Sequence, residues 1–257
     1  MRDLSELVVV KLGGTTIAEH HATLAGITRL SGNYRLVLVH GGGRRLTEWL
    51  ERLGMQSRFE DGRRVTDDDA LQVALAVLGG LINGELVADL QRLGAPAVGV
   101  TGIDGGLLAT ERMPQLGRVG RVIGARPSIL YALLAAELLP VVAPLALDER
   151  GEIVNVNADE AAGGLAASLG TRLVLLTDTD GVLDRSGQRI SHLDELEAEK
   201  LMSEGVIGGG MQPKVNAALA VIRSGGLEVV IGDGRADRAL ERALTGDDFG
   251  TRVIVSD

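Results

Sequence analysis

The stretch VLVHGGG at residues 37–43 places a short, β-branched apolar run directly before three glycines. The run predicts a buried strand, and the glycines predict a tight turn into a helix over residues 45–53. Similar runs of strand length occur at residues 7–10, 97–101, 141–143, 173–177, 228–231 and 253–255. Helical stretches alternate with these runs. This alternation predicts an α/β fold in which a central, mainly parallel sheet carries helices on both faces.

Three other segments shape the expected architecture. Residues 109–122 and 151–157 predict β-hairpins that form lids over the ligand edge of the sheet. Residues 70–90 predict a helix that is apolar on more than one face, which fits either a central core helix or a helix covered by a second subunit. Residues 129–147 are apolar but contain Pro140 and Pro144, so they predict a helix, a turn and a buried strand rather than a membrane span.

The composition excludes several classes of function. A net charge of −9 over 257 residues argues against nucleic acid as a partner, because nucleic-acid binding needs a basic surface. Cysteine is absent, which excludes disulfides and thiolate metal sites and fits a cytoplasmic protein. The first residues do not have the pattern of a signal peptide, and we expect no membrane partner.

The distribution of basic residues gives the first indication of chemistry. Of 26 basic residues only three are lysines: Lys11, Lys200 and Lys214. Lys11 stands just before Gly13-Gly14, and Lys214 follows a run of three glycines at residues 208–210. Glycine turns expose backbone N–H groups to phosphate oxygens, and a compact ammonium group can follow a phosphoryl group in transfer. Lys200 ends an acidic helical stretch and is expected to be solvated.

The glycine run at residues 41–43 predicts an anion site of uncommon design. Leu46 stands where a dinucleotide-binding motif would need its third glycine, and the chain contains no Walker sequence. The alternative is a purely structural tight turn. His40 is expected to brace this loop, and the polar turn after the strand at residues 173–177 is either part of a nucleotide site or a capped turn.

Six motifs in this order resemble the amino-acid kinase superfamily, and most closely its N-acetylglutamate kinase branch: KLGG (11–14), HGGG (40–43), GRRVT (62–66), NVNAD (155–159), TDTDGV (177–182) and GMQPKV (210–215). The resemblance covers essentially the whole chain. It implies a three-layer αβα sandwich with a mainly parallel sheet of about eight strands. It also implies two lobes: residues 1–170 would bind an acyl amino acid and form a homodimer, and residues 171–257 would bind ATP with Mg²⁺.

The resemblance also implies roles for individual residues. Lys11 and Lys214 would stabilise the phosphoryl group in transfer, and Asp159 would orient both lysines. Backbone N–H groups at the phosphate-binding Gly13 and Gly14 and at Gly42 and Gly43 would face the phosphoryl group and the acceptor, while Arg64 and Asn155 would hold the acceptor's α-carboxylate. The residues implied at the nucleotide are Asp178, Thr179, Asp180, Gly181, Val182, Leu183, Val206, Ile207 and Gly208. No residue is implied as a metal ligand.

The implied reaction is transfer of the ATP γ-phosphoryl group to the side-chain carboxylate of N-acetyl-L-glutamate, a step of arginine biosynthesis. A carboxylate with a pKa of about 4.3 is ionised at neutral pH and needs no general base. Two alternatives remain open: a sister kinase for another acid, such as a carrier-bound aminoadipate, and a non-catalytic nucleotide or metabolite sensor. Ile103, Arg118 and Arg121 depart from the usual pattern near the acyl group and lid. We expect a homodimer rather than an arginine-inhibited hexamer.

Overall fold

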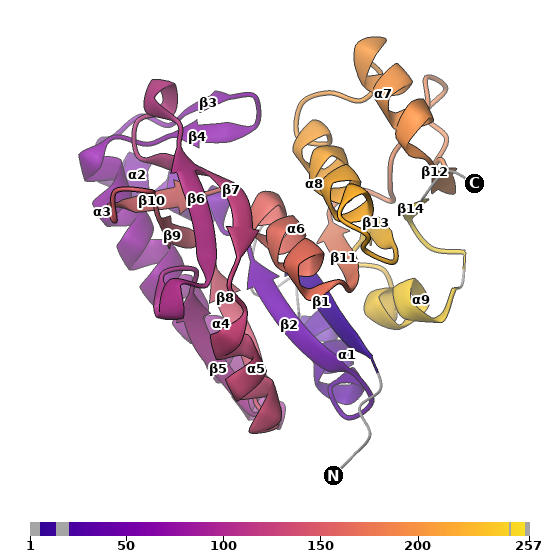
Figure 1. Ribbon diagram of the computed structural model, residues 1–257, viewed down its shortest axis with the longest axis horizontal. Coiled ribbons are helices and arrows are strands. Elements are labelled where there is room, and N and C mark those ends of the chain that lie inside the picture. Colours follow the sequence, from indigo (N-terminus) through magenta and orange to yellow (C-terminus); the bar gives the residue numbers. More distant parts are fainter. Residues whose placement is uncertain (1–5, 14–20, 247, 255–257) are drawn as a thin grey trace.

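The computed structural model describes residues 6–13, 21–246 and 248–254 and forms an α/β fold around one large sheet (Figure 1). The strands of this sheet follow the order β12-β14-β13-β11-β1-β2-β8-β5. Their bounds are β1 Leu7–Leu12, β2 Arg35–His40, β5 Ala97–Thr101, β8 Leu139–Ala143, β11 Arg172–Thr177, β12 His192–Leu193, β13 Val229–Asp233 and β14 Thr251–Val253. The six strands from β13 to β5 are parallel, and β14 runs antiparallel to β13. The predicted fold class is confirmed.

Strand β1 lies at the position where the chain changes its direction of winding. The chain first adds β2, β8 and β5 on one side of β1, and later adds β11 and β13 on the other. In the register, Lys11 is opposite both Val39 and Leu175, so the carboxyl ends of the three central strands lie together. Ligands of open α/β sheets bind at such a switch point, so this edge is where a site is expected.

Helices cover both faces of the sheet and enclose two apolar cores. One core involves α1 (His21–Leu30), α2 (Gly43–Arg52), α3 (Asp68–Ala74), α4 (Asn83–Arg92) and α9 (Ala239–Thr245). The opposite core involves α5 (Ser128–Ala135), α6 (Ala158–Leu169), α7 (Glu195–Ser203) and α8 (Gln212–Arg223). Central strands such as β1 contribute alternate residues to both cores, which is why they read as continuous apolar runs.

The long helix predicted at residues 70–90 is confirmed and extends over Asp68–Arg92, with a π-helical stretch at Leu75–Ile82 joining α3 to α4. By length and composition alone it could cross a membrane, yet 44% of its most apolar window is buried within this chain. Its core side packs on the sheet, whereas Ala76, Gly80 and Gly84 are exposed. The helix is therefore a core helix with one exposed stripe of small residues.

A second, four-stranded sheet and a two-stranded hairpin lie near the carboxyl edge of the large sheet (Figure 1). The second sheet closes in the order β10-β7-β6-β9, from β6 (Leu108–Arg112), β7 (Val119–Ala125), β9 (Leu145–Leu147) and β10 (Ile153–Val156). The hairpin predicted at residues 109–122 is confirmed as β6 and β7. Residues 151–157 hold only the second strand of their hairpin, because β10 pairs with the earlier β9. The separate hairpin consists of β3 (Arg58–Glu60) and β4 (Arg63–Val65).

Candidate active site

One carboxylate joins two lysines at the switch point of the sheet. Lys11 is the next-to-last residue of β1, Asp159 lies in the first turn of α6, and Lys214 lies in the first turn of α8. The Lys11 Nζ atom is 2.8 Å from Asp159 Oδ1, and the Lys214 Nζ atom is 3.0 Å from Asp159 Oδ2. The three side chains are 15% exposed or less. The predicted cluster therefore exists in the folded chain and carries one net positive charge.

Burial and charge act against each other in this cluster. Burial raises the pKa of Asp159, but the ammonium groups of Lys11 and Lys214 outweigh it, so the pKa lies below the usual range and the carboxylate is ionised. Burial lowers the pKa of Lys11, Asp159 opposes that change, and Lys214 adds to it. An anion entering between the two lysines would compensate the excess positive charge, so the cluster is suited to bind and stabilise phosphate.

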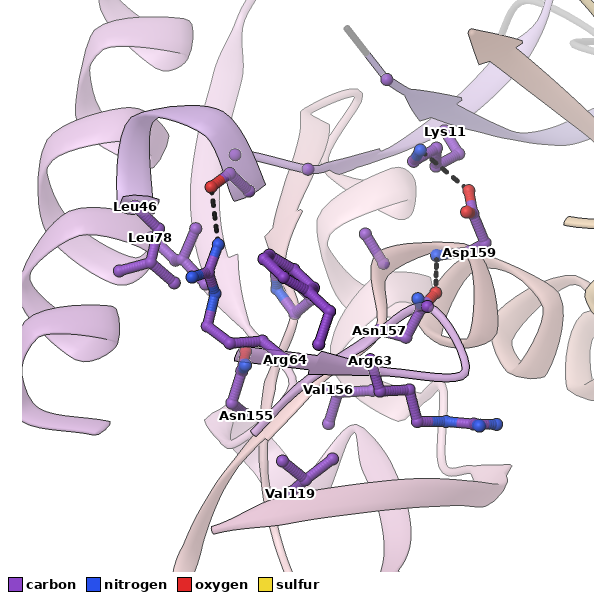
Figure 2. A pocket seen from close by; sticks show the side chains of 18 residues that line it. Lys11, Leu46, Arg63, Arg64, Leu78, Val119, Asn155, Val156, Asn157 and Asp159 are labelled. Atoms are coloured by element: carbon purple, nitrogen blue, oxygen red, sulfur yellow. Dashed lines mark hydrogen bonds and ion pairs between the residues drawn. The ribbon is translucent and has the colours of Figure 1, made fainter. Parts of the chain in front are cut away.

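Asn157, rather than Asp159, caps α6. The Asn157 side-chain oxygen accepts hydrogen bonds from the N–H groups of Asp159 and Glu160 at 2.8 and 3.2 Å. The Asp159 carboxylate is consequently free to turn toward the lysines, as Figure 2 shows for Lys11. Within this motif, Asn157 caps the helix and Asp159 pairs with the two lysines.

The triple-glycine loop leaves the N-terminal end of helix α2 without a side-chain cap. Gly42 precedes the helix, no side chain caps this end, and the first N–H groups of a helix have no partner within it. Gly42 has φ 151°, and a Cβ atom there would lie 2.4 Å from Ile82 Cδ1, so glycine is required both by conformation and by space. Gly42 and Gly43 both line the cavity beside Lys11. Their predicted role as N–H donors fits this placement.

His40 braces this loop, as the sequence predicted. Burial lowers its pKa to about 4, although the Gly41 carbonyl partly opposes the shift, so the ring is neutral at pH 7. Its Nδ1–H group donates to the Gly41 carbonyl at 2.7 Å, and Nε2 faces the Asn83 amide at 3.2 Å. Asn83 also donates to the Val141 carbonyl, which ties the loop to β8.

Arg64 brings a second positive charge into the same cavity. Its guanidinium donates to the Gly43 carbonyl and the Thr47 hydroxyl, both at 2.8 Å, and to Ser57. It lies 4.5 Å from the centre of the Phe59 ring. Within the described ranges Arg64 has no acidic partner, and burial lowers its pKa to about 10, so it stays charged at neutral pH. A buried cation with only neutral partners is a ready site for a carboxylate.

The cavity between Arg64 and the lysine cluster has a volume of about 210 Å³. Figure 2 shows Arg64 and Lys11 on opposite sides of it. Asn155 also lines it and donates to the Thr66 hydroxyl at 3.3 Å. Leu46, Leu78, Val119 and Pro144 form its apolar wall. The cavity thus offers a cation at one end, a phosphate-type site at the other and an apolar surface between them.

Gly13 and Gly14 are the two glycines predicted to bind phosphate, and the structure describes only Gly13. Gly13 lines the cavity, but its N–H group donates to the Leu176 carbonyl at 2.7 Å. A Cβ atom at Gly13 would lie 2.9 Å from Lys11 Nζ, so this glycine makes room for the lysine instead of offering an N–H group. Gly14 lies outside the described residues.

The residues predicted at the nucleotide lie in two segments, one of which directly follows the strand beside β1. Residues 178–183 follow β11, the neighbour of β1, and the Asp178 charge raises the pKa of Lys11. Asp178, Asp180, Leu183 and Gly208 are exposed, whereas Val182 and Ile207 are buried in the core and could present only backbone atoms. Thr179 and Val206 are half-buried, and Gly181 has φ 147°.

Sequence reasoning missed the side chains that support Arg64. Thr47, Ser57 and Phe59 contact its guanidinium, and the first two lie in segments with no motif. Phe59 had a usable signal, because it is one of only two phenylalanines and stands in a charged hairpin. The fold and the site together define an α/β protein with an anion-binding centre at the switch point of its sheet.

The chain belongs to the amino acid kinase family, whose sequence model matches residues 6–233. It is 42% identical to an acetylglutamate kinase of Solibacter usitatus, over 97% of this chain and 99% of that protein. It is 46% identical to an acetylglutamate kinase of Rubrobacter xylanophilus, over 96% of both chains. The family resemblance read from the six motifs is thereby confirmed.

Solved structures agree on the fold. The crystal structure of smu.665 from Streptococcus mutans has a TM-score of 0.83 at 25% identity, over 96% of this chain and 98% of that one. An N-acetylglutamate synthase from Neisseria gonorrhoeae has a TM-score of 0.85 at 24% identity, and this chain spans 60% of it. At 24% identity, the similarity to the N-acetylglutamate synthase shows the fold alone.

Proposed function

We propose that this protein transfers the γ-phosphoryl group of ATP to the γ-carboxylate of N-acetyl-L-glutamate, giving N-acetylglutamyl 5-phosphate. The observation that carries the proposal is the bridge of Lys11, Asp159 and Lys214, placed across one cavity from the uncompensated Arg64. Relatives that match the full length of the chain and carry the name acetylglutamate kinase support the same acceptor. The reaction is a step of arginine biosynthesis.

The two lysines stabilise the charge of the transferring group. Phosphoryl transfer passes through a loose transition state, so catalysis depends on positioning and on cations near the equatorial oxygens. Lys11 comes from β1 and Lys214 from α8, which lets them approach the phosphoryl group from two directions. Asp159 fixes their separation and keeps both nitrogens aimed at one point. The N–H groups of Gly42 and Gly43 add neutral donors at the α2 end.

The acceptor lies in the cavity with its α-carboxylate toward Arg64 and Asn155 and its γ-carboxylate toward the lysines. Arg64 offers a planar guanidinium that pairs with a carboxylate through two hydrogen bonds. The apolar wall accommodates the methylene groups and the acetyl group. The γ-carboxylate is ionised at neutral pH and attacks without help from a base.

ATP lies over the carboxyl edge of the second lobe, along residues 178–183 and 206–208. Asp178 directly follows β11 and is exposed, so its carboxylate is available to accept a hydrogen bond from the nucleotide or from water on Mg²⁺. The Mg²⁺ that accompanies ATP neutralises phosphate charge. We further propose a first lobe of residues 1–170, a second of residues 171–257, assembly as a homodimer and a location in the cytoplasm.

An acceptor panel tests this function. The product is an acyl phosphate, which hydroxylamine converts to a hydroxamate. Products that are phosphate esters or anhydrides do not give a hydroxamate, so the release of ADP is measured for every acceptor. With ATP and Mg²⁺, N-acetyl-L-glutamate is expected to exceed glutamate, aspartate, aminoadipate, carbamate and uridylate in kcat/KM by at least about 100-fold, because the analogues leave buried polar groups unpaired. A higher kcat/KM with any of these other acids would refute the proposed acceptor.

A further inference from the structure

The β3–β4 hairpin contacts both helices that carry the phosphoryl-transfer residues. Its turn residue Gly62 has φ 76°, and a Cβ atom there would lie 2.6 Å from Pro213 Cγ. Pro213 immediately precedes Lys214 in the first turn of α8. The hairpin tip therefore packs directly on the helix end that presents this lysine, and only glycine allows that approach.

Arg63 makes the second connection. Its Nε atom donates to Glu160 Oε1 at 2.7 Å, and the two side chains are 23% and 13% exposed. Glu160 follows Asp159 in the first turn of α6, and its N–H group donates to the Asn157 cap. Arg63 is thus anchored to a turn that is itself held by the cap next to the bridging carboxylate.

Arg64, the next residue, points the other way. Adjacent residues of a strand project to opposite sides, and Figure 2 shows Arg63 directed away from Arg64. Arg64 donates to the Gly43 carbonyl at the start of α2. Three consecutive residues therefore touch α8, α6 and α2 in turn, and the ends of α6 and α2 line the cavity.

We propose that Arg63 and Glu160 are a positioning pair that holds the acceptor in register with the two lysines. The inference rests on the proposed function. Arg63 lines the cavity beside Arg64, but its Nε–H group is held by Glu160, which does not line the cavity. The pair fixes the strand that carries Arg64 against the turn that carries Asp159, so an acceptor held by Arg64 has its second carboxylate at a set distance from Lys11 and Lys214. Small errors of placement at the reacting atoms cost about 100-fold in rate.

The kinetic test uses Arg63→Gln, Glu160→Gln and the double variant, with ATP, Mg²⁺ and N-acetyl-L-glutamate. Each single variant is expected to lose about 10- to 100-fold in kcat, with the KM for ATP within about twofold of the parent, because the ATP side is untouched. The double variant should fall no further than the worse single variant, because both remove one shared interaction. Arg63→Lys, which keeps the charge, should recover most of the activity.

The matched control is Arg58→Gln, which removes an exposed positive charge from the same hairpin. It is expected to leave kcat within about twofold of the parent, as a surface substitution does. Additive losses in the double variant, an equal loss in Arg58→Gln, or a kcat unchanged in Glu160→Gln would each overturn the positioning role.

A second measurement needs no acceptor and separates this inference from the proposed function. Hydrogen exchange of the amides of residues 58–65 is expected to be at least about tenfold faster in Glu160→Gln than in the parent, because the hairpin loses its anchor to α6. Unchanged exchange would overturn the inference even in an active kinase. If the parent phosphorylates a different acid, the proposed function fails while the exchange result still decides the role of the pair.

Discussion

Replacing Asp159 with asparagine removes the one negative charge between two lysines while keeping the shape of the side chain. Lys11 is then left 8% exposed without its ion-pair partner, and Lys214 repels it. Breaking a buried ion pair by removing one partner costs about 3–5 kcal/mol. The native state has one alternative, which is to release the proton from Lys11.

That alternative sets an upper limit on the cost. Each unit between the ordinary lysine pKa of about 10.4 and the working pH is worth about 1.4 kcal/mol, so a neutral Lys11 at pH 7 costs about 4.6 kcal/mol. Asp159→Asn is therefore expected to lose about 3 to 4.6 kcal/mol of unfolding free energy at pH 7. If Lys11 is neutral in the folded variant, the unfolded variant binds one proton more than the folded variant up to about pH 10.4, so the unfolding free energy of the variant rises with pH. The deficit should consequently shrink as pH rises from 7 to 9.

Urea denaturation of the parent and Asp159→Asn at pH 7, 8 and 9 measures both quantities. Asp68→Asn is the control, because Asp68 also lies in the first turn of a helix and pairs with an arginine, Arg118, but is 75% exposed. It is expected to lose less than about 1 kcal/mol. A loss in Asp159→Asn no larger than in Asp68→Asn, or a deficit that does not change with pH, would refute a buried, charge-compensated Lys11.

Three further outcomes follow from single contacts. Arg64→Lys is expected to raise the KM for N-acetyl-L-glutamate at least about tenfold, because the planar pairing is lost; steady-state kinetics with an unchanged KM would contradict the assignment. In the parent, His40 binds a proton at about pH 6.5 when unfolded but only near pH 4 when folded, so the parent loses unfolding free energy as the pH falls. His40→Gln has no such group, so the difference in unfolding free energy between the parent and this variant should shrink by about 3 kcal/mol from pH 7 to pH 4. Parallel pH profiles in urea denaturation would argue against the buried neutral ring. Asn157→Ala should lose about 1 kcal/mol, the usual worth of a helix cap, and an unchanged denaturation midpoint would rule the cap out.

The central sheet could be predicted from sequence because its strands are buried on both faces. Apolar runs at residues 97–101 and 173–177 correspond to β5 and β11 within one residue. The prediction failed where a strand owes its existence to tertiary contacts. The hairpin β3–β4 is short and charged, and Arg63 and Arg64 hold it against Glu160 of α6 and Gly43 of α2. The last strand begins at Thr251 instead of residue 253, because its pairing with Ile231 decides its start.

The residues of the site could be named from sequence, but their division of labour could not. Lys11, Asp159 and Lys214 lie far apart in the chain, and motif resemblance alone predicted that they meet. The capping role of Asn157 depends on the local backbone at the start of α6. The use of the Gly13 N–H group by Leu176 depends on the pairing of β1 with β11, which no local pattern encodes. The different contacts of Arg63 and Arg64 depend on strand geometry, which sends adjacent side chains to opposite sides.

Turnover of Lys214→Met with ATP, Mg²⁺ and N-acetyl-L-glutamate, measured beside its ATP affinity, tests the catalytic cluster most directly. Lys200→Met is the control, because Lys200 is exposed on α7 and is the one remaining lysine. The account predicts that Lys214→Met loses at least about 1,000-fold in kcat while its ATP dissociation constant stays within about tenfold of the parent, and that Lys200→Met keeps full activity. A Lys214→Met enzyme whose kcat stays within about tenfold of the parent would contradict it.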